Sequence, residues 1–594
     1  MGTWSQEFIN VALFTSATPH LAIRTLVEHD LLLDEGERAP KVLYFPRVRG
    51  VPIWWVTQQD ESLDLPPHIT VMVAPGAMIS ALGAGGRLTI HGELQAPVGQ
   101  IFPSAALPPP GISPDDIGLV TLLGDRLDVV HPEWWGGGNG TADGPAVDTH
   151  ALEEAIRVAI AYSVWRGRAP TIELLGRYQI KRALRLFSAT IGLATDGLEF
   201  RGRPGGEDDA NLSAADGFLG HAMLELDSWV RVQCRNLRFD GRFKANVCVR
   251  VQAQEPAEPV SWMRLPHSFA QCGFRGGTEA GLQVIEVESS LPIALRSVSA
   301  DEATPLVDMH GCMFFAAPPD FNITRFQRLY PNVAARLLGP RGGGTRFFNC
   351  CFVGRAAAMI HATNHDLVVT GCRFENTSVP TALRSGVAPA WREVHKQGPA
   401  GGVDIFLGGV FAPTQSFAGK QPEGSAPDPV EPKYKGGTDV AASQVPNDPP
   451  RPLASRQATL TAQDCRSSSL QFLVAVAIPR NVVVRDSTVI GLHHAFESAP
   501  IPDPLQLPPP ILWMAREGVP SGPSLQLIGC RIDGDGRRRA PMVFAPDGGD
   551  DQPTVFDYGT STDGRQLSTP TGHGAESFPG TFAPTAVGYV PFRR

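Results

Sequence analysis

The sequence predicts an all-β fold: a right-handed parallel β-helix solenoid with an N-terminal β-region and one capping helix. Three observations support this prediction: a short phrase that recurs along the chain, an interval of constant length that occurs more than once, and apolar columns that superpose at that interval. A period of roughly 20 to 25 residues is typical of a solenoid. The repeating segments are short and rich in Val, Leu and Phe, which favours strands over helices.

The recurring phrase is a small or polar residue, then Cys, any residue, and Phe or another apolar residue. It occurs at 271–274, 311–314, 349–352, 371–374 and 529–532, with degenerate copies at 464–467 and 486–489. The step from Cys350 to Cys372 has the same length as the step from Asp464 to Asp486. The longer steps, from Cys272 to Cys312 and from Cys312 to Cys350, fit the same unit with loop insertions.

Superposing the repeats predicts which residues point into the coil. Counterparts one coil apart stack about 4.8 Å along the axis, so inward columns must be apolar or small. The predicted columns are Leu367/Leu460/Val482, Val369/Ala462/Val484 and Phe374/Ser467/Val489. Cys behaves as a small hydrophobe in such a column, so the nine cysteines are predicted to fill the core as free thiols. Adjacent Cys350 and Cys351 should point to opposite faces.

The first third of the chain contains the N-terminal β-region and the helix. Residues 1–130 are predicted as the β-region, since extended segments at 42–45, 52–56, 69–73 and 88–91 alternate with Pro/Gly turns. Residues 10–35 have a mixed apolar pattern that assigns no element. Residues 131–200 should hold the helix and the first rungs. The helix is predicted at 148–162, with Asp148 or Thr149 as N-cap and an Ala/Leu/Ile stripe that covers the N-terminal end of the coil.

The rest of the chain is predicted to contain two blocks of rungs, at 201–376 and 458–540. Between them, residues 377–457 are dense in Pro, Gly and Ser, and this range is predicted as an insertion because Pro cannot donate to a strand ladder. Residues 541–594 are again polar and rich in Gly and Pro, which predicts a C-terminal tail or cap.

Several segments around the predicted helix resemble the opening of the pectate-lyase-like right-handed β-helix superfamily. They are the run at 132–143 (Pro-Glu-Trp-Trp-Gly-Gly-Gly-Asn-Gly-Thr-Ala-Asp), Asp148-Thr149-His150-Ala151-Leu152, and the strand at 172–180 that ends in Gly176-Arg177-Tyr178-Gln179-Ile180. The resemblance implies the β-helix fold. It also implies that the protein belongs to one of the classes that share this fold: polysaccharide lyases, glycoside hydrolases, phage tailspike-like proteins and non-catalytic relatives.

Members of that superfamily that are enzymes act on glycans at the outside of the helix, with carboxylates and basic residues from neighbouring rungs. The clearest stacked pair here is Asp464 and Asp486, with Arg466 nearby and Glu375 one rung position away. These four residues are the candidate catalytic group, because stacked carboxylates suit a glycosidase or lyase. The alternative is a turn ladder, since the same column holds Asn349, Gly371 and Gly529.

Other candidate residues carry weaker signals. His361, His493 and His494 are candidates to line a groove, with satisfied surface residues as the alternative. The pairs Trp54–Trp55 and Trp134–Trp135 are candidates to stack on sugar rings, because alternation should bury one indole of each pair and expose the other; hydrophobic capping of the helix end is the alternative. No cofactor is predicted. Calcium is the one metal with a candidate segment, Asp533-Gly534-Asp535-Gly536, for which a turn is the alternative.

Charge and hydropathy restrict the partners. A net charge of −9 argues against nucleic acid, and the absence of an apolar run long enough to cross a bilayer argues against a membrane span. The start of the chain lacks the basic residues of a secretory signal, so we expect export by another route, retention in the cell, or release with a particle. An extracellular or virion-associated location is favoured, and a homotrimer or larger assembly is compatible with it. Two functions stay open: a glycan-binding and glycan-cleaving protein that acts on a polysaccharide, and a non-catalytic structural or adhesive β-helix.

Overall fold

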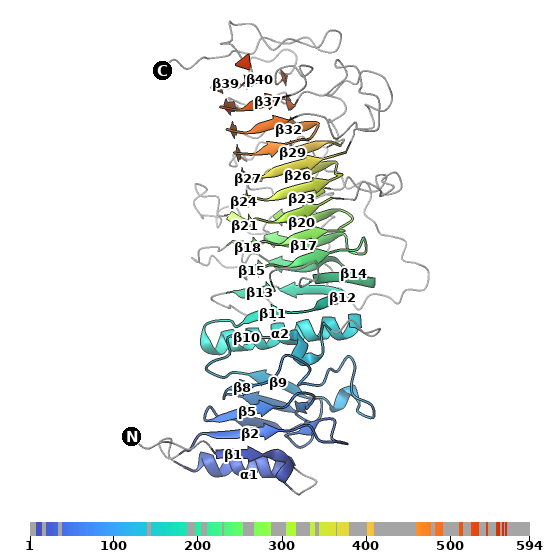
Figure 1. Cartoon of the computed structure of the whole chain (residues 1–594), viewed down its shortest axis with the longest axis vertical. Coiled ribbons are helices and arrows are strands. Elements are labelled where there is room, and N and C mark those ends of the chain that lie inside the picture. The colour runs from blue at the N-terminus through green and yellow to red at the C-terminus, as the bar shows by residue number, and fades with distance from the viewer. Residues whose placement is uncertain are drawn as a thin grey trace, which may run out of the picture. The chain divides into compact units, whose positions relative to one another are not determined.

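The computed structural model contains two compact units, one of residues 1–224 and 229–244 (unit 1) and one of residues 225–228 and 245–594 (unit 2). The structure describes these residues: 7–14, 19–33, 38–138, 144–186, 197–203, 211–227, 231–253, 266–286, 305–316, 333–338, 344–363, 365–378, 399, 401–408, 459–476, 481–490, 510–514, 524–533, 542–544, 554–558, 561–562 and 565–566. Apart from the last pair of unit 2, the strands within each unit pair in parallel, which confirms the β-helix (Figure 1).

The N-terminal part of unit 1 is itself a small three-sided coil. One side is formed by β1 (Glu7–Asn10), β2 (Lys41–Phe45), β5 (Ile69–Val73) and β8 (Leu94–Gln95), and another by β3 (Trp54–Trp55) and β6 (Ile79–Ser80). The third side is formed by β4 (Ser62–Leu65), β7 (Arg87–Ile90) and β9 (Leu119–Leu122). Trp54 pairs with Ile79 on the next coil. The number of residues in one coil of this β-region is therefore close to that of the repeats downstream.

A second helix that the sequence pattern did not reveal lies within the unassigned range 10–35. This helix, α1 (Pro19–Leu31), buries Ile23 and Val27 and carries Asp30, which is 1% exposed. The Asp30 carboxylate accepts hydrogen bonds from Lys41 and from His68 Nε2, the latter at 3.1 Å. Burial alone would raise the pKa of Asp30, but these two neighbours outweigh burial and hold the pKa below its ordinary value.

The helix predicted at 148–162 is present and longer, as α2 (Gly144–Arg166). Asp148 and Thr149 therefore lie inside the helix, and the prediction that either is its N-cap was wrong. Helix α2 packs against η4 (Pro132–Trp135) and β9 and also against β12 (Arg177–Leu186). It is thus an internal layer of unit 1 (Figure 1) rather than the outermost cap.

The remaining strands of unit 1 begin the larger coils. One ladder runs through β10 (Val129–Val130), β11 (Thr171–Leu174), β13 (Leu198–Gly202) and β15 (Val232–Arg235). The other contains β12, β14 (Asn211–Asp227) and β16 (Arg238–Asp240). A short 3-10 turn, η3 (Pro114–Asp116), precedes β9 and is closed by Ser113 and Asp116 in a capping box.

Unit 2 repeats a strand, a sharp turn, a short strand and a further strand in each coil. The strands before the turn are β18 (His267–Ala270), β21 (Pro305–His310), β24 (Gly344–Phe348), β27 (Asp366–Thr370), β30 (Thr459–Gln463), β33 (Asn481–Arg485), β36 (Ser524–Ile528) and β39 (Thr554–Tyr558). The short strands after it are β19 (Gly273–Arg275), β22 (Met313–Phe315), β25 (Cys351–Gly354), β28 (Arg373–Asn376), β31 (Arg466–Ser467), β34 (Thr488–Ile490), β37 (Arg531–Asp533) and β40 (Ser561–Thr562).

The third series closes each coil. It contains β17 (Val247–Ala253), β20 (Ala280–Glu286), β23 (Val333–Leu338), β26 (Ala358–Thr363), β29 (Val403–Gly408), β32 (Gln471–Val476), β35 (Ile511–Met514) and β38 (Met542–Phe544), and β41 (Arg565–Gln566) pairs antiparallel with β40. Strand β29 lies inside the range 377–457 that was predicted to form no rung, so the coil passes through that range. Strands β38 to β41 likewise extend the coil into the predicted tail at 541–594.

The core of unit 2 contains the predicted columns. Strand register pairs Leu367 with Leu460 and Leu460 with Val482, and the two other predicted columns are paired in the same way. The rings of Phe274, Phe314, Phe352 and Phe374 are at most 1% exposed and stack with centroids 4.7–4.9 Å apart. The cysteines are free, and Cys350 is buried while Cys351 is half-buried on the other face. These observations confirm the inward Cys and Phe columns.

Candidate functional site

Asp464 and Asp486 lie on adjacent coils at the turn before the inward Cys column. Their strands β30 and β33 pair so that Gln463 faces Arg485, which places the two aspartates directly one above the other. Both side chains are exposed. The backbone amide of Asp464 donates to the carbonyl of Arg485 at 3.1 Å, and that of Asp486 donates to the carbonyl of Ile528 at 2.7 Å. The coil-to-coil ladder therefore continues through the turn.

The turn has a left-handed backbone in every coil where this column is described. Asp464 has a φ of 52° and Asp486 a φ of 49°, and the same region is adopted by Gln271, Gly311, Asn349, Gly371 and Gly529. Glycine adopts this conformation at little cost, and Asn and Asp are the residues that otherwise tolerate it best. The turn ladder that was the alternative interpretation thus gives a structural reason for an aspartate at each position.

Arg466 and Glu375 lie on the face that follows the turn. Arg466 pairs in register with Arg373 on the preceding coil, and both side chains are exposed. Glu375 lies on the same strand as Arg373 and forms an ion pair with it at 3.4 Å. The structure thus brings Asp464, Asp486 and Arg466 onto two adjacent coils, whereas Glu375 is ion-paired with Arg373.

An aromatic pair lies on the same side of the coils and nearer the N-terminal end of unit 2. The rings of His310 and Phe348 stack with centroids 4.9 Å apart and planes 14° apart. Arg346 forms a two-point ion pair with Asp308, with both N–O distances 2.6 Å, and its guanidinium lies 5.9 Å from the Phe348 ring centroid. Sequence reasoning missed this group. The alternation of inward and outward residues in 305–310 and 344–348 was the signal that could have identified it.

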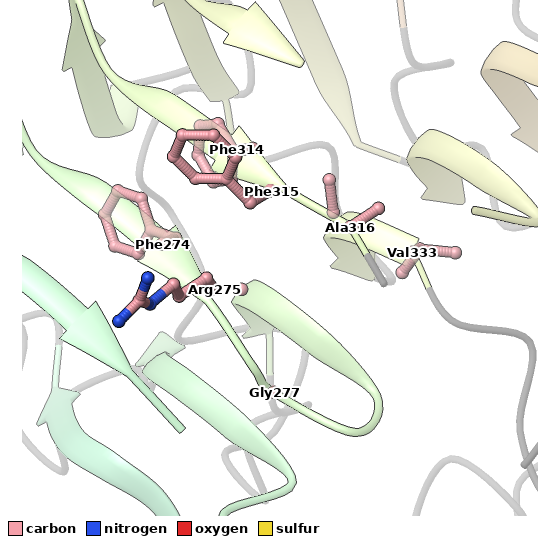
Figure 2. A pocket seen from close by; sticks show the side chains of 9 residues that line it. Phe274, Arg275, Gly277, Phe314, Phe315, Ala316 and Val333 are labelled. Carbon is pink, nitrogen blue, oxygen red and sulfur yellow. The ribbon is translucent and has the colours of Figure 1, made fainter. Parts of the chain in front are cut away.

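A small cavity opens beside the short strands β19 and β22. Figure 2 shows that Phe274, Phe314 and Phe315 border it on one side and Ala316 and Val333 on the other. Its volume is about 10 Å³, which is the room of about one water molecule. A sugar ring cannot enter a cavity of this size.

His361 does not line a groove, and that prediction was wrong. Its side chain is fully buried, and Nε2 lies 3.1 Å from the carbonyl oxygen of Gly408. Burial is the main cause that lowers the pKa of His361 to about 3, so the imidazole is neutral at physiological pH. His493 and His494 lie outside the described residues.

The tryptophan pairs differ from each other. Trp54 is buried and Trp55 half-buried in β3, as alternation predicts. Trp134 and Trp135 are 6% and 3% exposed, because they lie in the turn η4 rather than in a strand. The prediction of one exposed indole in that second pair was wrong, and neither ring is available to a ligand.

A buried polar cluster joins α2 to its neighbours in unit 1. Glu133 accepts hydrogen bonds from the Tyr178 hydroxyl and from the amide of Leu175, the latter at 3.0 Å. Asp148 accepts from the amides of Gly138 and Gln179, both at 2.7 Å. Burial raises the pKa of Asp148 to about 6 despite these two hydrogen bonds. The two Asp148 oxygens each have a backbone donor from a different segment, which is the arrangement of a structural clamp.

Among the described residues, no three His, Cys, Asp or Glu side chains are grouped to hold a metal ion, and Asp535 of the calcium candidate lies outside them. The helices that the structure describes include none with the length and apolar character needed to cross a bilayer.

Comparisons with known proteins give two similar solved structures. No family model matches the chain, and no curated protein matches it. A protein described as Geobacillus virus E2 ORF18 is 11% identical with a TM-score of 0.33, and the match covers 74% of this chain and 63% of that one. The full-length tailspike protein 2 of Escherichia coli O157:H7 bacteriophage CAB120 is 9% identical with a TM-score of 0.27, covering 73% and 38%. The chain thus spans less than two thirds of either protein.

Proposed function

We propose that this chain is a polysaccharide-directed β-helix protein that binds an extracellular glycan along the side of unit 2. The observation that carries the proposal is the stacking of exposed polar side chains at coil spacing, with Asp464 and Asp486 before the Cys column and Arg466 after it. Because coils repeat about every 4.8 Å, a polymer that lies along them meets equivalent positions repeatedly. A small molecule would instead need an enclosed pocket.

The proposal has a second part, which is that the bound glycan is also cleaved. Asp464 and Asp486 have backbones about one coil, or about 4.8 Å, apart, which is near the carboxyl separation of about 5–5.5 Å that retaining glycosidases use. Arg466 would offset negative charge on the substrate, and Glu375 would supply a further carboxylate one coil away. These four residues stay our candidates for catalysis if the bound glycan is cleaved.

A non-catalytic structural or adhesive role is the second candidate function. The left-handed turn conformation of Asp464 and Asp486 favours it, because that conformation explains both aspartates without catalysis. An adhesive β-helix would also bind a glycan. It would differ from the glycan-cleaving candidate in that no glycosidic bond is broken.

The proposal is tested with a panel of purified bacterial and plant polysaccharides. Binding is measured on immobilised glycans, and cleavage is measured by reducing ends and by the absorbance of unsaturated uronates. If cleavage occurs, D464N and D486N should each lower its rate by roughly 100-fold or more, whereas D64N, at an exposed aspartate of unit 1, should not. Full activity in both variants would move catalysis elsewhere, and binding without cleavage would favour the adhesive role. Absence of binding to every polysaccharide would refute the proposal.

A further inference from the structure

The aromatic pair of unit 2 belongs to one outward column that runs through four coils. Strand register places Ala270 next to His310, His310 next to Phe348, and Phe348 next to Thr370. The column thus holds two stacked rings with a small side chain at each end. Because counterparts stack along the coil axis, the outer face of each end ring is directed toward the neighbouring small residue.

The two ends of this stack differ. At the Phe348 end, the ring is half-buried, the Arg346 guanidinium lies 5.9 Å from its centroid, and Thr370 contributes a branched side chain. At the His310 end, the ring is exposed and the adjacent Ala270 contributes only a methyl group. The space over Ala270 is therefore where a further ring could continue the stack at the same spacing of about 5 Å.

The polar groups around the stack are locally neutral. The charge of Arg346 is matched by Asp308 in their two-point ion pair, and Asn349 in the adjoining turn is exposed and carries no charge. The coils further along the same column instead present exposed charged groups, Arg485 in the column and Arg466 just after the turn, with Asp464 and Asp486 in the turns beside them. One side of unit 2 thus offers a ring-stacking surface at one end and arginines beside carboxylates at the other.

We propose that the space over Ala270, against the His310 ring, is a subsite for an uncharged sugar ring, and that Arg466 and Arg485 contact a carboxylate-bearing sugar of the same polymer. The ligand class is then an acidic heteropolysaccharide. This inference rests on the proposed function and adds which sugars the side of unit 2 distinguishes. A sugar ring has an apolar face of C–H groups that packs on an aromatic ring, while its hydroxyls reach neighbouring amides and charged groups.

The test uses saturation-transfer NMR with two probes, methyl galactoside as the uncharged sugar and methyl glucuronide as the acidic one. A270Y fills the space over Ala270 with a protein ring. It should therefore weaken galactoside binding by roughly two- to tenfold, which is the change in affinity expected from the loss of one aromatic contact. T370Y extends the same column at its other end and should leave galactoside binding unchanged. H310A should weaken galactoside binding as A270Y does. R466A and R485A should weaken only glucuronide binding, and R87A in unit 1 serves as the charge control.

Thermal stability separates this subsite from a purely structural stack. A270Y should keep or raise the melting temperature, because a third ring extends the stack, while it lowers galactoside binding. Unchanged galactoside binding in both A270Y and H310A, or no saturation of galactoside in the native protein, would overturn the subsite even where a polysaccharide still binds. A change of oligomeric state in A270Y by sedimentation, with galactoside binding intact, would assign the surface to a second copy and also overturn it. If no polysaccharide of the panel binds, the proposed function itself fails.

Discussion

Asp486 extends its carboxylate over the α-carbon of Gly529 on the next coil. Its Oδ1 lies 2.6 Å from the position that a Cβ on Gly529 would occupy. Gly529 also has a φ of 60°, in the left-handed region. A side chain at this position would therefore be disfavoured twice, by backbone strain and by contact with the neighbouring turn.

We expect G529A to destabilise unit 2 by roughly 1 to 3 kcal/mol, because alanine is strained in the left-handed conformation and its Cβ displaces the Asp486 carboxylate. The free energy of unfolding from urea titration checks this. The matched control is G311A: Gly311 lies in the same column with a φ of 60°, but the nearest atom to its added Cβ is Gln271 Cγ at 3.8 Å. If G311A costs as much as G529A, contact between neighbouring turns is not the cause.

The phenylalanine ladder should contribute far more stability than the outward rings of the same strands. Phe352 is fully buried between Phe314 and Phe374, so F352A should cost roughly 3 to 5 kcal/mol through lost packing and the cavity that remains. Phe315 is 44% exposed, and F315A should change stability by at most about 1 kcal/mol. Comparable losses in the two variants would contradict the inward assignment of the column.

The buried thiols should report opening of the coil. Burial raises the pKa of Cys312, and the neighbouring Cys312 thiol raises that of Cys350, so neither forms the reactive thiolate readily. Only Cys351 is partly exposed, and burial raises its pKa as well. We expect Ellman's reagent to modify about one thiol slowly at pH 8 in the native protein and all nine in denaturant. C351A should abolish the native reaction, and persistent native labelling in that variant would mean that a core column is open.

Asp148 should make unit 1 less stable as the pH rises from about 4 to about 6. Its folded pKa of about 6 lies above the ordinary value of 3.8, so the folded state retains a proton in this window that the unfolded state releases. A shift of this size corresponds to about 3 kcal/mol, which is fully present below pH 4 and lost above pH 6. D148N should remove this dependence. The measurement is the free energy of unfolding of the native protein minus that of D148N at several pH values, and a flat difference would contradict the assignment.

The fold could be predicted from the sequence periodicity because a solenoid stacks equivalent residues. Leu367 and Leu460 lie on opposite sides of the range 377–457, yet the repeat phrase alone placed them in one column, and the strand register confirms it. The same logic placed Cys350 inward and Cys351 outward. It failed where no repeat exists, as at helix α1, and where a segment is not a strand, as at Trp134 and Trp135 in η4.

The candidate site depended on the structure more strongly. The sequence by itself determined that Asp464 and Asp486 stack one coil apart, because that follows from the constant repeat interval. Only the tertiary structure decided that both occupy left-handed turns, that Glu375 pairs with Arg373, and that His361 is buried. It also revealed the stack of His310 on Phe348. The physical reason is that inward packing imposes a regular pattern on the sequence, whereas the outward face is under no packing constraint, so its contacts follow from the register of neighbouring coils and the path of each turn.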